Sequence, residues 1–293
     1  MKNHSYLKVP ILITLLSLAS VAMAAEEKKS ARPTVFNRDT AMLAVYGEYN
    51  EQHKGTLGPV QYTNSWDMKN ASVLATPIMA ATYTEGGIRK GVIAIQRQTI
   101  LNGEVVDSHA TAAGISVYVF AFNGKEYVFE KGKQTVTEAG AHGSAPGGTL
   151  IKIGRDKYGL LFEGGDIHQG FTNDYTFIIS LSTPTPAVVV ELETGESYND
   201  WVWEGKIEFI EDTTKDHFVL KVTSQGTKQE INEDKSRPLN KVEYYVYDNG
   251  KYQPITDKKY ATYKTVALKE IYPAGDIDRK GMTILTVPRK LLR

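Results

Sequence analysis

The amino-acid sequence predicts an all-β fold: an antiparallel sandwich or barrel, or a propeller-like meander of hairpins, with little helix. Apolar residues recur at every second position in several segments, the period of a strand with one buried face. Asn-Gly pairs, which suit two-residue hairpin turns, separate β-prone segments at 102–103, 123–124 and 249–250. Strands do not alternate with helical segments, as they would in an α/β protein.

Composition narrows the function classes. The 293 residues include 34 Lys and Arg, 34 Asp and Glu, and no Cys. The absence of cysteine excludes a disulfide scaffold, a thiolate metal site and a cysteine nucleophile. A formal net charge of zero argues against a nucleic-acid partner, because phosphate binding needs an excess of basic residues. The apolar share of 41 % and charged share of 23 % are those of an ordinary globular protein.

The first 24 residues have the pattern of a secretory signal peptide. Lys2 and Lys8 precede an apolar stretch over 11–21, and Ala22-Met23-Ala24 offers the small residues that signal peptidase accepts. The stretch is shorter than the roughly 20 apolar residues of a spanning helix, and no other segment approaches that length. We therefore expect cleavage after Ala24, a flexible leader over 25–33 and no transmembrane segment in the mature chain. Secretion without cysteine favours the bacterial periplasm.

Helical signals are short. Asp39 could cap a segment over 40–46. The segment 72–82 has apolar content but carries Pro77 in its middle, so it is expected to form at most one or two helical turns.

The clearest predicted strand covers 201–210, and 218–223 is expected to be its antiparallel partner. Its apolar face consists of Trp201, Trp203, Ile207 and Phe209, and its polar face of Glu204, Lys206 and Glu208. Upstream, 187–192 is short and rich in β-branched residues, which favours another strand.

The three Asn-Gly pairs predict hairpins. Residues 117–128 and 243–254 have similar sequences, in which an aromatic-rich segment is followed by Asn-Gly-Lys. We interpret them as two similar hairpins rather than an internal repeat. The prolines of 181–186 mark the most favourable domain boundary. It would separate an N-terminal β domain over 34–181 from a C-terminal one over 187–293, although one continuous β domain is also compatible with the length.

Candidate binding residues lie mainly in two glycine-rich segments, 140–148 and 163–175, each containing one histidine. Glycine lets the main chain approach a ligand closely, and loops often carry function. Rows of exposed tyrosine also suit contacts with a partner. The predicted ligand-binding or partner-binding residues are His142, Gly147, Gly148, Asp166, His168, Asp174, Tyr175, Tyr245 and Tyr247.

Two chemical alternatives use the same segments. A hydrolase would combine Ser144 with His168 or His142 and with Asp166 or Asp174, but Gly143-Ser144-Ala145 lacks the second glycine of a nucleophile elbow. A metal site would draw on Asp166 and the histidines at 109, 142 and 168, but none of these has close ligand spacing. We therefore expect no resident metal and no cofactor.

The sequence thus favours an exported, non-catalytic binding module for an envelope protein or a glycan. A periplasmic hydrolase that uses the 142–174 loops is one alternative. The other is a structural subunit of an envelope assembly that adds strands edge to edge.

Overall fold

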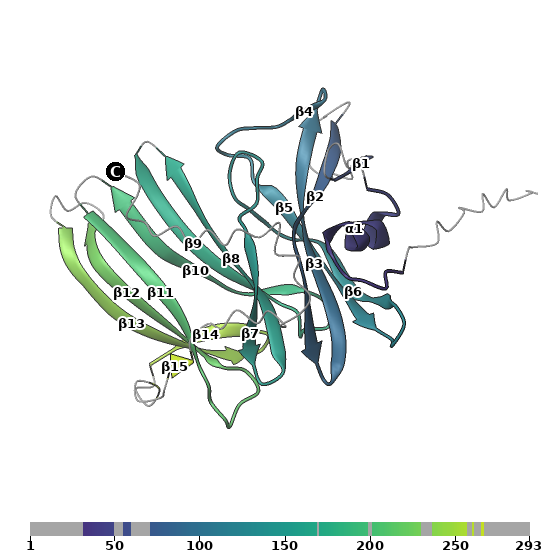
Figure 1. Cartoon of the computed structure of the whole chain (residues 1–293). Coiled ribbons are helices and arrows are strands. Elements are labelled where there is room, and N and C mark those ends of the chain that lie inside the picture. Colours follow the sequence, from purple (N-terminus) through teal and green to yellow (C-terminus); the bar gives the residue numbers. More distant parts are fainter. Residues whose placement is uncertain are drawn as a thin grey trace, which may run out of the picture.

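The computed structural model describes residues 32–49, 55–59, 71–168, 170–198, 201–229, 236–256, 260 and 265–266. They form two antiparallel sheets and one α-helix, which confirms the all-β prediction (Figure 1). The expected signal peptide over 1–24 lies outside the described residues, as does all of the expected leader except 32–33. Within the described part, no helix has the length and apolar character that crossing a membrane requires.

The first sheet has six strands in the order β1-β2-β3-β5-β6, with the short β4 paired to β3. Neighbouring strands in this sheet are antiparallel. The strands are β1 (Thr56–Pro59), β2 (Ala71–Glu85), β3 (Ile88–Leu101), β4 (Glu104–Val105), β5 (Ala113–Phe122) and β6 (Tyr127–Ala139).

The helix α1 (Arg38–Tyr46) covers one face of the first sheet. Its N-cap is Asn37 rather than the expected Asp39: the Asn37 side chain accepts a hydrogen bond from the Thr40 backbone N–H at 2.9 Å. The Thr40 hydroxyl in turn accepts one from the Asn37 backbone N–H, which completes a capping box. The helix packs its buried residues Ala41, Met42 and Ala44 against Ala75, Ile93, Ile95, Phe120 and Tyr127.

The expectation of helical turns over 72–82 is wrong, because these residues belong to β2. Pro77 lies at an irregularity of the β2–β3 register, between Pro77 and Met79. It also lies beyond Ala75, the last β2 residue that β1 pairs with. A strand tolerates proline at a bulge or a free edge, where its missing N–H is not needed.

The second sheet has nine strands, and β7 to β14 follow one another in space in the order of the sequence. The remaining strand, β15, pairs with β11. The strands are β7 (Gly148–Gly154), β8 (Lys157–His168), β9 (Phe171–Ser180), β10 (Ala187–Tyr198), β11 (Trp201–Ile210), β12 (Val219–Gln229), β13 (Ser236–Asp248), β14 (Lys251–Ile255) and β15 (Thr265–Val266).

Two expectations about connections change in the structure. The segment 163–175 is not a loop, because β8 and β9 extend through it and pair as far as His168 and Phe171. The segment 181–186 joins β9 to β10, which are paired neighbours in one sheet. The chain passes from the first sheet to the second at 140–147. Division of the chain into two domains at 181–187 stays a prediction.

The three Asn-Gly pairs all connect paired strands, as predicted, but they do so in two ways. Asn102 and Asn249 have φ of 54° and 47°, and each is followed by a glycine that also has positive φ. These are the dihedrals of a two-residue hairpin turn. At the third pair only Gly124 has positive φ, and the Asn123 side chain accepts hydrogen bonds from the backbone N–H groups of Lys125 and Glu126. The β5–β6 turn is therefore longer.

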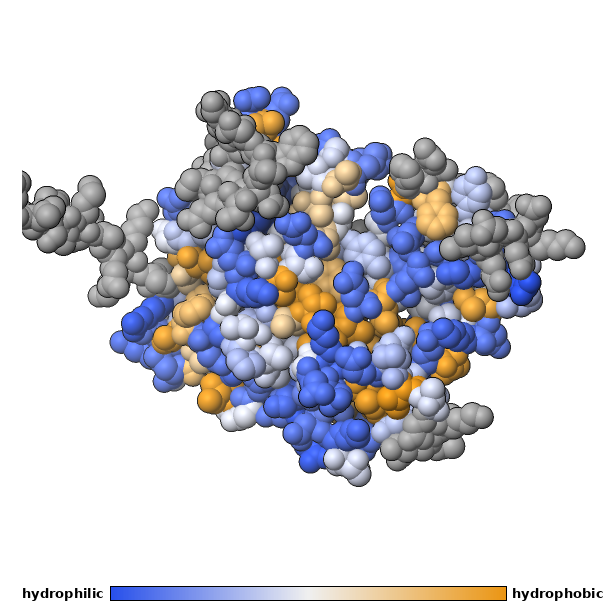
Figure 2. Space-filling model, turned by 180° about the vertical axis from the view of Figure 1, so that it is seen from behind, coloured by the Kyte–Doolittle hydropathy of each residue, from blue (hydrophilic) through white to orange (hydrophobic). Residues whose placement is uncertain are grey.

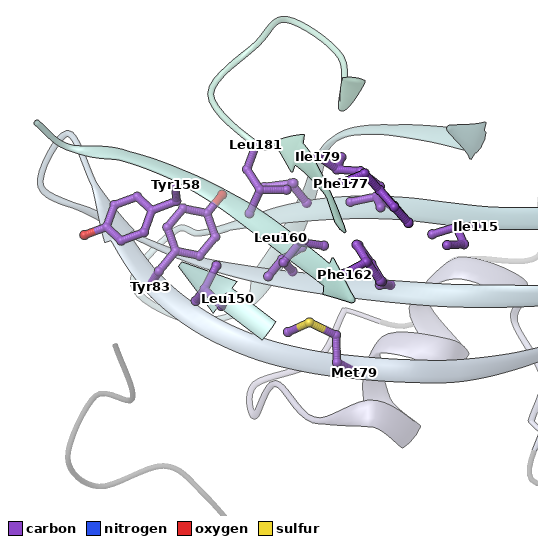
Figure 3. Close-up of a cluster of buried hydrophobic side chains, with 14 of the residues drawn as sticks. Met79, Tyr83, Ile115, Leu150, Tyr158, Leu160, Phe162, Phe177, Ile179 and Leu181 are labelled. Atoms are coloured by element: carbon purple, nitrogen blue, oxygen red, sulfur yellow. The ribbon is translucent and has the colours of Figure 1, made fainter. Parts of the chain in front are cut away.

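The largest hydrophobic core lies between the two sheets (Figure 3). Met79 and Tyr83 of β2 and Ile115 of β5 contribute from the first sheet. The second sheet contributes residues of β7, β8 and β9: Leu150, Tyr158, Leu160, Phe162, Phe177 and Ile179. Viewed from behind, hydrophobic residues gather near the middle of the molecule and hydrophilic residues surround them (Figure 2).

A second core lies within the curved second sheet, which brings strands far apart in the sheet order together. Ile151 and Ile153 of β7 pack with Phe209 of β11 and Tyr252 of β14. The Tyr252 hydroxyl donates to the Ile153 carbonyl at 3.1 Å, and the Phe218 N–H donates to the same carbonyl at 2.9 Å. The curvature therefore closes the sheet around its own apolar side chains.

A charge cluster around the buried Lys90 lies at the junction of the sheets beside the first core. The Lys90 ammonium donates to the carboxylates of Glu85 at 2.9 Å and Glu130 at 2.8 Å. The other Glu85 oxygen accepts from the Ser182 hydroxyl, in the β9–β10 connection. Burial lowers the pKa of Lys90, but the hydrogen bonds to the two glutamates outweigh it and leave the pKa raised. The ammonium is thus held charged at the junction.

Candidate binding groove

A groove of about 910 Å³ runs along β11 and β12 of the second sheet and reaches β8. Apolar and polar side chains share its lining. The lining residues are Leu161, Glu163, Val202, Trp203, Glu204, Gly205, Lys206, Ile207, Glu208, Lys221, Thr223, Gln225 and Gly226.

The groove exists because β10 and β11 are paired over only part of their length. Their ladder has four residue pairs, from Gly195 opposite Glu204 to Tyr198 opposite Trp201. A register irregularity in the β9–β10 ladder lies between Glu193 and Gly195, where β10 departs from regular pairing. At the far end of β11, β15 pairs with Phe209 and Ile210. The groove residues of β11 therefore lie mainly between these two ladders.

Two glycines allow strands to approach closely here. A Cβ at Gly205 would lie 3.2 Å from the Cα of Thr194 in β10. Gly226 has a φ of 136°, and a Cβ there would lie 2.2 Å from the Val202 carbonyl oxygen. A larger residue at position 226 would need both a disfavoured backbone and a displaced neighbour.

The polar part of the groove follows the alternation of β11. Trp201, Trp203 and Phe209 are buried, whereas Glu204 and Lys206 are exposed, which confirms the two predicted faces of this strand. In the ladder with β12, the polar residues Glu204, Lys206 and Glu208 lie opposite Gln225, Thr223 and Lys221.

Glu208 is the electrostatic centre of this face. Its two carboxylate oxygens accept hydrogen bonds from Lys206 Nζ at 2.9 Å and Lys221 Nζ at 3.1 Å. The hydrogen bond from Lys206 is the largest influence on the Glu208 pKa; together with Lys221 it outweighs the cost of burial and lowers that pKa. Next to this cluster, the buried Thr223 hydroxyl has no hydrogen-bond partner among the described residues.

A second charge cluster borders the Trp203 end of the groove. The Trp203 indole N–H donates to Glu196 at 2.7 Å, and Lys228 lies 2.9 Å from the same carboxylate and 3.6 Å from that of Glu193. The Lys228 ammonium lies 5.1 Å from the centre of the Trp203 ring, within cation–π range. Burial and the nearby charge of Glu196 raise the pKa of Glu193.

The residues of the hydrolase alternative have other partners or positions. His142 Nδ1 lies 2.7 Å from the Asp107 carboxylate, and the His142 ring contacts the ring of His109. Ser144 is exposed, and Asp166 lies opposite Asn173 in the β8–β9 ladder. Among the described residues, no hydrogen bond links Ser144, His142 and Asp166 to one another. The side chain of His168 lies outside the description.

The glycine-rich segments contact each other through Tyr175, whose hydroxyl accepts a hydrogen bond from the Gly140 N–H at 2.8 Å. Gly147 directly precedes β7, and Gly148 is its first residue. Asp174 lies in β9, opposite Gly165 of β8. These segments therefore connect and extend strands near the junction of the sheets.

Tyr245 and Tyr247 are partly buried against the second core. The Tyr247 ring stacks on His217 with 3.7 Å between ring centres. None of the binding residues predicted from the sequence lines the groove. Sequence reasoning placed Glu204, Lys206 and Glu208 on one polar strand face, but alternation alone does not distinguish a solvated face from a binding surface.

Within the described part of the chain, no group of three or more His, Asp or Glu side chains is arranged to hold a metal ion. Comparison with protein-family models, curated proteins and solved structures finds no match for this chain.

Proposed function

We propose that this protein is an exported, non-catalytic binding module that holds an envelope glycan in the groove of the second sheet. The observation that carries the proposal is the lining of that groove. Hydrogen-bond donors from Lys206 and Lys221 lie beside the Glu208 acceptor, and Thr223 and Gln225 contribute further polar side chains to the lining. Sugar hydroxyls both donate and accept, so they match such a mixed surface.

The lining favours a glycan over a protein partner. The cores of protein interfaces are depleted in Lys and Glu, whereas three glutamates and two lysines line this groove. The apolar residues beside them, such as Leu161 and Val202, can contact the C–H faces of a sugar. Mixed apolar walls with a few polar groups are typical of small-ligand sites.

The proposed location follows from the N-terminal sequence. Lys2, Lys8, the apolar stretch 11–21 and Ala22-Met23-Ala24 support export to the periplasm with cleavage after Ala24. Envelope glycans are accessible there, so location and proposed ligand agree.

Titration of the purified mature protein with soluble envelope-type oligosaccharides tests the proposal. Quenching of tryptophan fluorescence provides the readout, because Trp203 lines the groove. We expect Lys221→Met to weaken binding by about tenfold, the loss of one charge-assisted hydrogen bond. Lys133→Met, on the exposed part of β6, is the matched control and should bind as the wild type does.

Equal binding by wild type and Lys221→Met would place the ligand elsewhere, and binding of none of the oligosaccharides would contradict the glycan proposal. Shortening of the oligosaccharide during incubation would contradict a non-catalytic role. The urea midpoint of each variant verifies that the fold is intact.

A further inference from the structure

Three Asn-Gly pairs lie in exposed turns of this protein. Asn-Gly is especially prone to spontaneous deamidation, because the glycine has no side chain to obstruct its backbone nitrogen. In this reaction the glycine nitrogen attacks the side-chain carbonyl carbon of the asparagine. The attack needs a rotation about the asparagine Cα–C bond that a closed turn does not permit, so the turn must open first. The three pairs are chemically alike, but their turns differ in what opposes opening.

The pair at 123–124 is held by the side chain of its own asparagine. The Asn123 side-chain oxygen accepts hydrogen bonds from the Lys125 N–H at 3.0 Å and the Glu126 N–H at 2.9 Å. The Asn123 N–H also donates to the Glu126 carbonyl at 3.1 Å. Opening this turn therefore breaks three hydrogen bonds before the side chain is free to react.

The pair at 249–250 closes a longer hairpin. β13 and β14 pair over five positions. Tyr252, next to the turn in β14, is buried in the second core, and its hydroxyl donates to the Ile153 carbonyl. The Asn249 side-chain N–H also donates to the Asp248 carboxylate at 3.0 Å. Opening this turn therefore disturbs a buried aromatic residue.

The pair at 102–103 closes the shortest ladder of the three. β4 pairs with β3 through two residue pairs, and one further backbone hydrogen bond runs from the Val106 N–H to the Thr99 carbonyl. The first β4 residue is exposed and the second is half-buried. The Asn102 side chain makes no hydrogen bond with the described residues. Opening this turn therefore costs less free energy than opening either of the others.

We infer that Asn102 is the site at which this protein deamidates, in preference to Asn123 and Asn249. The Gly103 nitrogen forms a bond to the Asn102 side-chain carbonyl carbon and gives up its proton. The bond from that carbon to the side-chain nitrogen breaks, and ammonia leaves. Water then opens the cyclic imide at one of its two carbonyls and yields aspartate or isoaspartate. In total one water is consumed, one ammonia is released and the site gains a carboxylate, which is ionised at neutral pH.

The product alters the hairpin and its surroundings. Isoaspartate directs the main chain through the former side chain, which adds one methylene to a turn built for two residues. β4 leads into a segment whose Ser108 and Thr111 carbonyls accept hydrogen bonds from the N–H groups of His142 at 3.0 Å and Gly143 at 2.7 Å. These two residues lie where the chain passes between the sheets. Isoaspartate in the turn is therefore expected to loosen this contact.

Incubation of the full mature protein in a mildly alkaline buffer, followed by peptide mapping, tests the inference. Cleavage after Glu104, Glu126 and Glu243 places the three Asn-Gly pairs on separate peptides, and mass spectrometry measures the conversion of each. Asn123 and Asn249 are controls within the same molecule. We expect Asn102 to convert at least about tenfold faster than either control. In concentrated urea, which removes the folded structure, the three rates should agree within about twofold.

A preference for Asn102 in the folded protein alone would support the inference. Equal or faster conversion of Asn123 or Asn249, or a preference that persists in urea, would overturn it, because the hairpins would then not determine the order. Absence of conversion at all three pairs in the folded protein would also overturn it, since the β3–β4 turn would then stay closed. Unchanged amide hydrogen exchange at His142 and Gly143 in the converted protein would contradict the expected loosening.

Discussion

Two three-membered charge clusters of this protein have opposite composition, and one lysine of each differs greatly in exposure. At the junction of the sheets, one cation, Lys90, lies between the carboxylates of Glu85 and Glu130. In the groove, one carboxylate, Glu208, lies between Lys206 and Lys221. The Lys90 side chain is 10 % exposed, whereas that of Lys206 is 74 % exposed.

The difference in exposure between the two lysines predicts different energetic contributions to stability. A buried ion whose partner is removed is left without water and costs several kcal/mol. An exposed ion can exchange its protein partner for water or for a ligand at little cost. Similar Lys–Glu chemistry therefore holds β2, β3 and β6 of the first sheet together at the junction and leaves adaptable polar groups in the groove.

The largest expected effect comes from removing the buried cation. Lys90→Met leaves two carboxylates together at the junction and should lower the free energy of unfolding by about 3–5 kcal/mol. Lys206→Met, which removes the exposed lysine of the groove cluster, should change it by less than about 1 kcal/mol. Urea unfolding of the two variants measures the contrast. Similar losses of unfolding free energy in the two variants would show that the exposure of the lysine does not determine its contribution to stability.

A backbone substitution tests the junction independently of charge. Gly140 has a φ of 86°, and a Cβ there would lie 1.8 Å from the Ser144 carbonyl oxygen. Gly140→Ala should lower the free energy of unfolding by about 2 kcal/mol or more. Gly147→Ala, seven residues further on, meets no atom within 4 Å and should stay within about 0.5 kcal/mol of wild type. Thermal unfolding of the two variants measures the difference. If both variants melted at the wild-type temperature, the close approach of Gly140 to the Ser144 carbonyl would be contradicted.

The smallest effect is expected from acid titration of the groove cluster. Because the Glu208 pKa is lowered from 4.5 in the folded state, its stabilisation is present above that value and is lost as pH falls through the lower folded pKa. The contribution should be below about 1 kcal/mol, since Lys206 is largely exposed. In Glu208→Gln, the unfolding free energy should therefore vary less between about pH 5 and pH 3 than in wild type. If the unfolding free energies of wild type and Glu208→Gln depended on pH identically, Glu208 would not be the group whose titration changes stability.

Much of the fold followed from local patterns in the sequence. The alternation of Trp201, Trp203 and Phe209 with charged residues identified β11 and its buried face. The Asn-Gly pairs located three hairpins, and two of these have the positive φ at adjacent residues that a two-residue turn requires. The prediction of helical turns over 72–82 was wrong because the sequence does not show the partner strands. A proline fits in β2 only because it lies at a bulge and beyond the end of β1.

The groove could not be predicted in the same way. It depends on where β10 stops pairing with β11, and on β8 facing residues some forty positions later in the chain. The glycine-rich segment 140–148 attracted attention because glycine is common in ligand-binding loops. In the structure Gly140 is instead required for a close backbone approach to Ser144. The glycine content of 140–148 indicated an unusual backbone conformation, but it did not distinguish ligand binding from close packing of the chain.

The sequential order of β7 to β14 has a consequence for how the polypeptide acquires its shape. Every strand in this run finds its partner one hairpin away, so ordering can spread from any hairpin to the next without closing a long loop. Short loop closures favour rapid folding of a β-rich chain, which is otherwise slow when its pairings are distant in sequence. The contacts of β7 with the Phe218 region and with Tyr252 are exceptions, because they join the start of the meander to strands later in its order. They are expected to form last and to complete the sheet.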